Sequence, residues 1–271
     1  MMIGFQYDRE LNAMKIGILY ICTGIYEIFW KDFYLSSEKY FIPEVDKEYW
    51  VFTDAESIYD MDKENVHVIY QESLGWPGNT LFRFKVFKQC WDEYDKCDYL
   101  FFCNANVQFM EKVTEDILDK EKITVVQHPG FWREGCDKFP YDRNPESGAY
   151  IAKGQGNVYV MGGLNGGPTK IYKKLITDLE LSIDKDYAKG IVALWHDESH
   201  INKYIQSHPY KLLNPSYGYP QGWFRFPFKK IVLLRDKVLC GGRQFIKNKN
   251  WSVIEQVRYY LNLLFNIVRK H

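Results

Sequence analysis

The sequence predicts an α/β domain built on a Rossmann-like, mainly parallel sheet. Short apolar segments of strand length alternate, along the first half of the chain, with segments of helical periodicity. The chain has 271 residues, of which 46% are hydrophobic, so it is long and apolar enough to bury a sizeable core. Both observations favour a single globular domain with an open sheet.

Each predicted element follows from its local pattern. Residues 15–22, KIGILYIC, form an apolar run typical of a buried strand, and Thr23-Gly24 ends it. The remaining predicted strands are 49–53, 66–70, 98–103 and 123–127, and the predicted helices are 26–40, 80–94, 168–180 and 195–204. Open α/β sheets bind ligands at the carboxyl ends of their strands. We therefore expect residues 22–23, 104–106 and 128–129 to lie near one site.

The second half of the chain is less regular. Residues 154–167 contain six glycines, and this segment has two interpretations: a tight turn before a helix, or a close approach of the backbone to a ligand. Residues 214–228 are dense in proline, glycine and aromatic residues and predict a loop. Because we find no repeat and no linker, we expect a single domain over 15–248, an extension over 1–14 and a separate segment over 249–271.

Composition excludes several classes of protein. The chain has 35 basic and 35 acidic residues, and this balance argues against a nucleic-acid-binding protein. Its six cysteines, which have neither CxxC nor zinc-ribbon spacing, predict a reducing cytosol without disulfides. The N-terminus does not have the pattern of a signal peptide, and no stretch is long and apolar enough for a transmembrane helix.

The last segment, 249–271, predicts an amphipathic helix with basic residues beside a broad apolar face. One interpretation is a helix packed on the domain or on a second subunit. The other is an interfacial helix on an anionic membrane surface, which would make the protein cytoplasmic and peripheral on the inner face of the membrane.

The motif WHDESH at 195–200 concentrates polar chemistry. His196 and His200 are four residues apart and would share a helix face, as in zinc proteases. That chemistry needs a glutamate directly after the first histidine, where this chain has Asp197, so we do not expect zinc hydrolysis. A plain surface helix with acidic residues in its first turn is one alternative. Trp195 beside two carboxyl groups instead favours a sugar site, in which Asp197 and Glu198 divide binding and catalysis.

Several motifs together resemble glycosyltransferase family 6, which includes the histo-blood-group A and B transferases and the α1,3-galactosyltransferase. The matching segments occur in family order at 49–54, 98–100, 128–131, 149–151, 162–167 and 195–204. The resemblance implies a GT-A fold merged with an acceptor-binding region. It implies a retaining α1,3 transfer of galactose or N-acetylgalactosamine from UDP to the 3-OH of a β-galactoside, often fucosylated. Without the anchor and stem of vertebrate members, the chain looks like a bacterial form.

The resemblance also implies roles for individual residues. Glu198 matches the carboxylate beneath the anomeric carbon, as a nucleophile or an ion-pair stabiliser, and it also counts among the acceptor contacts. The implied donor contacts are Ile21, Cys22, Thr23, Tyr26, Arg83, Asn104, Ala105, Asn106, Met161, Gly162, Gly163, Asp197 and Lys237. The remaining implied acceptor contacts are His128, Trp195 and His196.

Donor choice follows from the same comparison. Gly163 leaves room for an N-acetyl group, and Gly130 also follows the A-type pattern. Met161, by contrast, resembles the bulky B-type residue. We therefore favour UDP-N-acetylgalactosamine over UDP-galactose as the donor.

Asn104-Ala105-Asn106 stands where the family has a metal-binding Asp-x-Asp. Amides are neutral, whereas a divalent metal prefers carboxylates, so we expect neither a metal nor any other cofactor. The charge that stabilises the leaving diphosphate must then come from basic side chains. Arg83 and Lys237 are the first candidates, and Arg243 and Lys247 are secondary ones. The basic segment 229–249 is either a mobile lid over the donor or a solvated surface loop.

Two other classes of function remain as alternatives. A non-catalytic sugar-binding module could use Trp195 and the aromatic loop, with the asparagine pair as a remnant of lost catalysis. A dinucleotide oxidoreductase is weaker, because CTGIY follows the first strand where GxGxxG would be needed. If 249–271 binds a membrane, we expect the acceptor to be a lipid-linked glycan.

Overall fold

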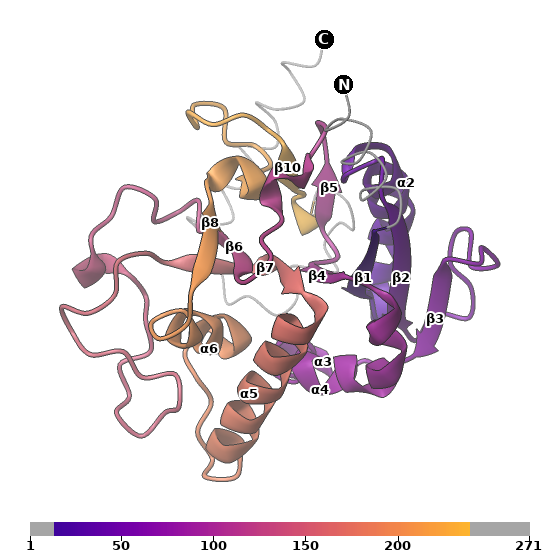
Figure 1. Ribbon diagram of the computed structural model, residues 1–271. Helices are drawn as coiled ribbons and strands as arrows, with labels where there is room; N and C mark the ends of the chain where they lie inside the picture. The colour runs from indigo at the N-terminus through magenta and orange to yellow at the C-terminus, as the bar shows by residue number, and fades with distance from the viewer. Residues whose placement is uncertain (1–13, 239–271) are drawn as a thin grey trace.

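A seven-stranded sheet organises residues 14–238, the part of the chain that this computed structural model describes. Its strand order is β3-β2-β1-β4-β7-β6-β8 (Figure 1). The strands are β1 (Lys15–Ile21), β2 (Asp46–Thr53), β3 (Val66–Tyr70), β4 (Tyr99–Cys103), β6 (Ile123–Gln127), β7 (Val160–Pro168) and β8 (Tyr210–Leu213). All neighbouring pairs are parallel except the two that β7 makes with β4 and β6. The predicted mainly parallel α/β sheet is therefore confirmed.

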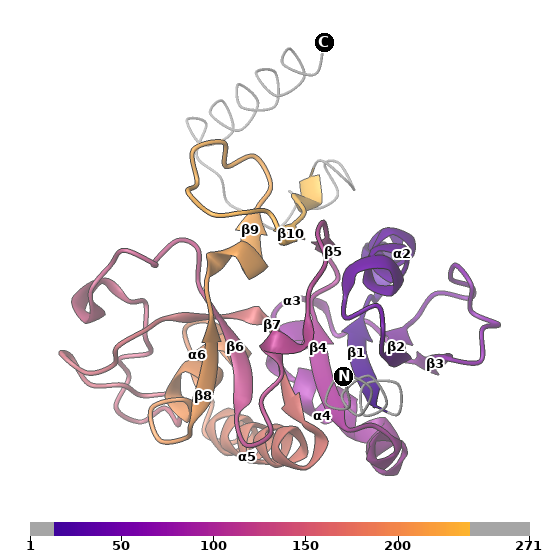
Figure 2. The same ribbon diagram turned by 45° about the horizontal axis from the view of Figure 1, so that its top comes forward.

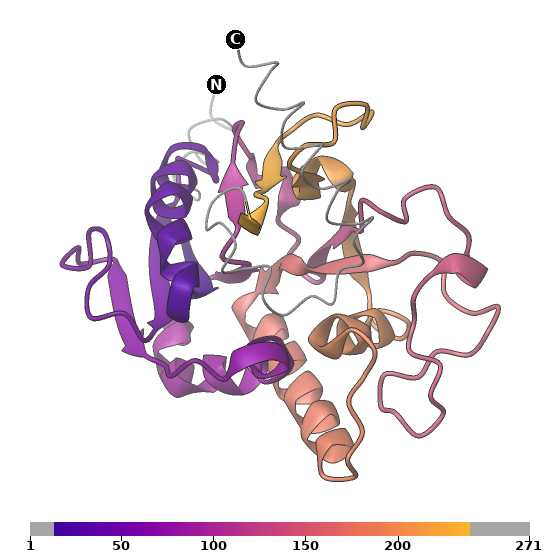
Figure 3. The same cartoon turned by 180° about the vertical axis from the view of Figure 1, so that it is seen from behind.

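Helices cover both faces of this sheet. On one face lie a 3-10 helix, η1 (Gly24–Phe29), and α2 (Trp30–Tyr40), where Tyr20 of β1 stacks on Phe33 with 4.3 Å between ring centroids. On the other face, Leu19 packs in a cluster with Phe87 and Tyr172. This face carries α3 (Gly75–Leu81), α4 (Arg83–Phe87), α5 (Thr169–Tyr187) and α6 (His196–Tyr204) (Figures 1 and 3). Successive residues of β1 thus point to opposite cores, as a doubly covered strand requires.

A second, three-stranded sheet rises above the carboxyl ends of the main strands. It has the order β5-β10-β9, with β5 (Val107–Phe109), β10 (Val232–Leu234) and β9 (Tyr219–Pro220) (Figure 2). β10 is antiparallel to β5. This pairing returns the end of the described chain to the loop that follows β4, although more than a hundred residues separate the two in sequence.

The loop over 128–158 forms the far edge of the molecule, opposite β3 (Figures 1 and 3). It has a small core of its own, in which Phe139, Tyr141 and Ile151 pack with Tyr159, the next residue along the chain after the loop. The buried carboxylate of Asp186, near the end of α5, ties this loop down by accepting a hydrogen bond from the Gly148 backbone N–H at 2.7 Å. The short 3-10 helices η3 (Glu115–Ile117), η4 (Cys136–Lys138) and η5 (Pro215–Gly218) complete the irregular segments.

Residues 160–167, the second part of the glycine-rich segment, belong to the central strand β7, so the interpretation of these residues as a tight turn was wrong. A Cβ atom on Gly166 would lie only 2.3 Å from the Phe101 ring of β4, so glycine allows the two strands to pair there. The close approach at Gly166 is to a neighbouring strand, whereas the earlier glycines of β7 border the candidate site.

Two predicted helices differ in detail. Over 26–40, the first residues form η1, and the α-helix begins only at Trp30. Over 80–94, the single predicted helix is divided into the end of α3, all of α4 and most of the 3-10 helix η2 (Lys88–Lys96). Phe82 and Cys90 have φ/ψ values outside the α region, and the shorter pieces that result pack their apolar side chains into one core cluster.

Within residues 14–238, no helix is both long and apolar enough to cross a bilayer. The cysteines that the structure describes are unpaired. The predicted helix over 249–271, Arg243, Lys247 and nearly all of the extension over 1–14 lie outside the described residues, so those interpretations stay predictions.

Candidate active site

A pocket opens at the carboxyl ends of β4 and β6, beside the start of β7. Its lining residues come from five separate parts of the chain: Asn104, Asn106, His128, Pro129, Met161, Gly163, Glu198, Leu234 and Lys237. Because β7 runs antiparallel, its first residues lie next to the last residues of β4 and β6. The structure therefore brings the predicted segments 104–106 and 128–129 to one place, as expected from the sheet.

The segment after β1 borders this pocket through Tyr26. The Lys237 ammonium lies 3.3 Å from the Tyr26 hydroxyl and 5.0 Å from the centroid of its ring. Ile21 is partly exposed, whereas Cys22 is fully buried and Thr23 nearly so. Of the predicted contacts over residues 21–26, Ile21 and Tyr26 thus keep exposed surface.

Glu198 is the carboxylate that faces the pocket. It lies in the first turn of α6, where one oxygen accepts a hydrogen bond from the Tyr159 hydroxyl at 2.7 Å. The other oxygen accepts one from the Gly162 backbone N–H at 2.8 Å. Burial raises the pKa of Glu198 to about 7, against the opposing effect of these two hydrogen bonds. The side chain is therefore held in one orientation and titrates near neutral pH.

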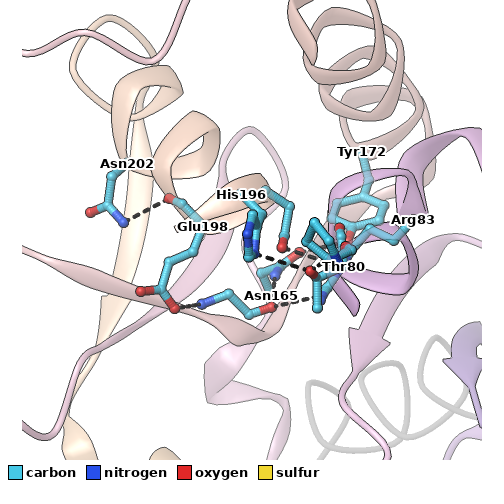
Figure 4. A network of polar contacts seen from close by, with 10 residues as sticks. Thr80, Arg83, Asn165, Tyr172, His196, Glu198 and Asn202 are labelled. Carbon is cyan, nitrogen blue, oxygen red and sulfur yellow. Dashed lines mark hydrogen bonds and ion pairs between the residues drawn. The ribbon is translucent and has the colours of Figure 1, made fainter. Parts of the chain in front are cut away.

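A bulge in β7 supplies the backbone donor for Glu198. Opposite β6, the register jumps from Asn165 to Met161, so residues 162–164 have no partner on that strand. The freed Gly162 N–H points at Glu198, and the Gly162 carbonyl accepts from Arg83 at 3.2 Å and from Asn165 at 3.1 Å (Figure 4). Bulges commonly redirect groups beside functional sites, and here the bulge turns a peptide unit toward the carboxylate.

Asp197 and Arg83 form a buried ion pair behind this bulge. Arg83 Nε lies 3.2 Å from a carboxylate oxygen of Asp197, and both residues are less than 5% exposed. Burial raises the pKa of Asp197 to about 6, which the positive charge of Arg83 opposes. The Arg83 guanidinium also lies over the Phe102 ring, 4.3 Å from its centroid. Its charge is thus directed at Asp197, and Arg83 is not among the residues that line the pocket.

Asn202 joins α6 to β7. Its side chain accepts from the Val160 N–H at 3.0 Å and donates to the Val160 carbonyl at 2.8 Å. It also donates to the Glu198 carbonyl at 2.9 Å (Figure 4). This one buried amide therefore fixes the position of α6 relative to β7, and with it the position of Glu198 next to Gly162.

His128 is arranged to act as a neutral donor. Its Nδ1 accepts a hydrogen bond from the Gly130 backbone N–H at 3.0 Å, so the ring proton lies on Nε2. Loss of hydration lowers the pKa of His128 to about 4. A neutral Nε2–H at the pocket wall is suited to a hydroxyl group of a ligand.

Trp195 and His196 lie at the N-terminus of α6. The Trp195 side chain is about half exposed, and His196 has a positive φ of 51°. The His196 ring contacts the exposed Trp76 edge to face, and its Nδ1 lies 3.2 Å from the Thr80 hydroxyl. His200, four residues on, is instead buried against Ser182, so the two histidines do not share a metal-binding face.

Asn104, Ala105 and Asn106 follow β4. The backbone of Asn104 donates to the Gly163 carbonyl at 2.8 Å, which holds the loop against β7. The Ala105 side chain is buried, and its carbonyl accepts from the Tyr20 hydroxyl at 2.8 Å. The Asn106 amide donates to the Arg235 carbonyl at 2.7 Å.

These residues do not suit a divalent metal ion. Mn²⁺ and Mg²⁺ prefer carboxylate oxygens, and this loop offers two amides, one of which already donates to a carbonyl. Within residues 14–238, His, Cys, Asp and Glu side chains nowhere gather in a group of three that could hold a metal.

Sequence reasoning did not identify Tyr159, Asn165 or Asn202. Each is buried or nearly so, and each orients a predicted site residue through a hydrogen bond. Tyr159 lies in a run, NVYV, that looks like ordinary strand sequence. Its role follows only from the pairing of β7 with the helix that carries Glu198.

The fold and the site define an α/β protein with a pocket at the carboxyl ends of its strands, faced by one ionisable carboxylate. The sequence model of glycosyltransferase family 6 matches residues 4–234. This chain therefore belongs to glycosyltransferase family 6, and its sheet is consistent with a GT-A-like fold.

Three relatives illustrate the breadth of the similarity. The O-antigen biosynthesis glycosyltransferase WbnI of Escherichia coli is 36% identical over 224 residues, which cover 83% of this chain and 95% of WbnI. Histo-blood group ABO system transferase 2 of Rattus norvegicus is 32% identical, and the aligned residues cover 88% of this chain and 73% of that transferase. Globoside α-1,3-N-acetylgalactosaminyltransferase 1 of Gallus gallus is 29% identical, and the aligned residues cover 87% of this chain and 70% of that enzyme.

Proposed function

We propose that this glycosyltransferase moves N-acetylgalactosamine, in preference to galactose, from UDP to the 3-OH of a β-galactoside, with retention and without a metal ion. The observation that carries this proposal is the oriented Glu198 carboxylate, held by Tyr159 and Gly162 at the wall of a pocket that also contains His128 and Lys237. The names of the relatives support the linkage and the type of acceptor: an α-1,3 transfer for the globoside enzyme and an O-antigen glycan for WbnI.

Glu198 can serve retention in two ways. It can attack the anomeric carbon as the bond to UDP breaks, which gives a covalent intermediate. The acceptor O3 then displaces the glutamate, and the proton of the acceptor 3-OH passes to a phosphate oxygen of UDP. It can instead stabilise an oxocarbenium-like sugar while the acceptor enters from the side that UDP leaves. Both routes need an ionised Glu198, and in both the Tyr159 and Gly162 donors keep it in place.

The packing of Met161 supports N-acetylgalactosamine as the donor sugar. Met161 is 4% exposed, and its Sδ occupies the space that a Cβ on Gly218 would need, at 2.5 Å. Its bulk is therefore accommodated by η5. A Cβ on Gly163 would lie 3.3 Å from Met161 Cε and 3.6 Å from Asn104, so glycine keeps this part of the pocket wall free of a side chain that would compete with an N-acetyl group for space.

A donor panel tests this function. The full chain is incubated in excess EDTA with UDP-N-acetylgalactosamine or UDP-galactose and with a β-galactoside, with and without an α1,2-fucose. We expect UDP release and an α1,3-linked product, with higher kcat/KM for UDP-N-acetylgalactosamine. Replacing Gly163 by alanine should lower that preference at least several-fold.

The non-catalytic sugar-binding module is the outcome that would overturn the proposal. It would bind UDP or the acceptor without releasing UDP from either donor. Transfer that appears only after addition of Mn²⁺ would overturn the metal-free part alone. A lipid-linked acceptor in a parallel arm tests whether the natural acceptor is presented at a membrane.

A further inference from the structure

We propose that Asn106 is a positioning residue that places Lys237 over the pocket. Its side-chain amide ties the backbone of Arg235, and Lys237 two residues later supplies the positive charge that a metal ion would otherwise supply to the leaving diphosphate. The inference rests on the proposed function, because it takes the pocket to be the site of a nucleoside diphosphate.

The tie consists of two hydrogen bonds between the same two residues. The Asn106 side-chain amide donates to the Arg235 carbonyl at 2.7 Å, and the Arg235 backbone N–H donates to the Asn106 carbonyl at 2.8 Å. They continue the antiparallel pairing of β5 with β10, whose last register pair is Leu234 with Val107. The side chain of Asn106 thus adds one more hydrogen bond between the two segments where the backbone pairing of the strands ends.

This hydrogen bond needs a donor at residue 106, which an amide supplies and an ionised carboxylate does not. The Arg235 carbonyl is an acceptor, so the atom of residue 106 that faces it must carry a hydrogen. An aspartate in the same rotamer would set a carboxylate oxygen against a carbonyl oxygen at hydrogen-bond distance, and the two would repel. The substitution that removes a metal ligand at position 106 therefore also creates a hydrogen-bond donor that the chain uses.

The tie matters because Lys237 has an available charge. Among the described residues, Lys237 has no carboxylate partner, whereas the neighbouring Arg235 pairs with Asp32 at 2.9 Å and Arg83 pairs with Asp197. The Lys237 ammonium instead rests against Tyr26 at the pocket wall. Of the described basic residues predicted to meet the diphosphate, Lys237 is thus the one whose charge faces the pocket.

A second hydrogen bond also holds the same segment. The Asp236 backbone N–H donates to the Gln221 side chain at 2.8 Å, from the loop after β9. Loss of the Asn106 bond should therefore release Lys237 in part and leave the fold intact. We expect the effect on ligand affinity to be about five- to tenfold, the range of one half-buried hydrogen bond.

The test is a double-mutant cycle on UDP binding, measured by calorimetry in excess EDTA with the full chain. N106A and K237A should each weaken UDP binding, and the double variant should be no more than about twofold weaker than K237A, because Asn106 acts through Lys237. Losses that multiply in the double variant would overturn the inference and make Asn106 a direct ligand of UDP.

A matched pair separates the tie from simple charge. N104D and N106D each add one negative charge to the same loop, but only N106D removes the donor to Arg235. N106D should weaken UDP binding more than N104D, and added Mn²⁺ should not restore it. Equal losses in the two variants would assign the effect to charge alone.

Hydrogen exchange reports on the tie without any ligand. Backbone amides over 232–237 should exchange faster in N106A than in the wild-type protein and should be unchanged in N104A. If the wild-type chain does not bind UDP, the proposed function fails while this measurement still tests the tie. If UDP binds but N106A leaves both exchange and affinity unchanged, the inference fails and the proposed function stands.

Discussion

Glu198 combines two properties at the scale of a single residue: a fixed orientation and a raised pKa. Tyr159 and Gly162 donate to its two oxygens, yet burial still raises its pKa to about 7. Only the ionised form can attack the sugar or stabilise its positive charge. The rate of transfer should therefore follow this ionisation.

The pH dependence has a definite sign. Because Glu198 must be deprotonated, kcat/KM should rise with pH through about 7, where it is half-maximal, and level off above about pH 8. Asp197, whose burial raises its pKa to about 6, should steepen the acid side. Since the pKa of His128 is lowered to about 4, this residue stays neutral and adds no step between pH 5 and 9. A rate that falls as pH rises through 7 would show that a protonated carboxyl is required instead.

Removing the charge of Glu198 should separate chemistry from binding. E198Q keeps the shape and loses the negative charge, so we expect kcat to fall by roughly 1000-fold or more. Its affinity for UDP, measured by calorimetry, should change by no more than about twofold. Y159F is the control, because it keeps the carboxylate, removes one hydrogen bond and should cost about tenfold. Near-normal turnover by E198Q would remove Glu198 from its central role.

At the scale of a secondary-structure element, β7 determines the geometry of the candidate site. Its antiparallel course puts Met161 and Gly163 beside the ends of β4 and β6, and its bulge turns Gly162 toward Glu198. The strand can occupy this place only because its later glycines let neighbouring strands come close. Gly166 is the tightest example, with Phe101 on the adjoining β4.

Two glycine variants should therefore differ in stability. A Cβ at residue 166 would lie 2.3 Å from the Phe101 ring and 2.5 Å from the Leu100 carbonyl, so G166A should lower the free energy of unfolding by about 3 kcal/mol. G163A, whose Cβ would have no contact closer than 3.3 Å, should change it by less than about 1 kcal/mol. Urea unfolding measures both, and equal stabilities would contradict this account of β7.

At the scale of the whole molecule, a single ligand should link several parts of the chain. The pocket draws residues from the ends of β4 and β6, from β7, from α6 and from the segment after β10. Binding of UDP should therefore stabilise the folded protein as a unit, and the charge that holds the diphosphate should belong to the chain itself.

Thermal unfolding with UDP tests this integration. At a UDP concentration 100 times Kd, binding adds about 2.7 kcal/mol, which should raise Tm by roughly 5 to 10 °C. The same increase should occur in excess EDTA, and K237A should reduce it. An increase that disappears with EDTA would contradict a metal-free site.

Particular residues show how much of the candidate site could be predicted from the sequence alone. It placed Asn104 and His128 at strand ends that meet, and it placed Glu198 in the first turn of a helix beside them; the structure confirms both positions. It did not anticipate that the glycines of β7 form a strand. A run of glycines with few side chains has no periodicity to distinguish a strand from a turn.

By itself, the sequence determined the α/β class and the order of the main strands and helices along the chain, because apolar periodicity is local. The carboxylate at residue 198 was singled out by its motif and by the resemblance to the family. Only the tertiary structure decided the register of β7, the donation from Tyr159 to Glu198, and the tie between Asn106 and Arg235. These contacts join residues 39 and 129 positions apart. Such pairings depend on how the whole chain packs its two cores, and no local pattern contains that information.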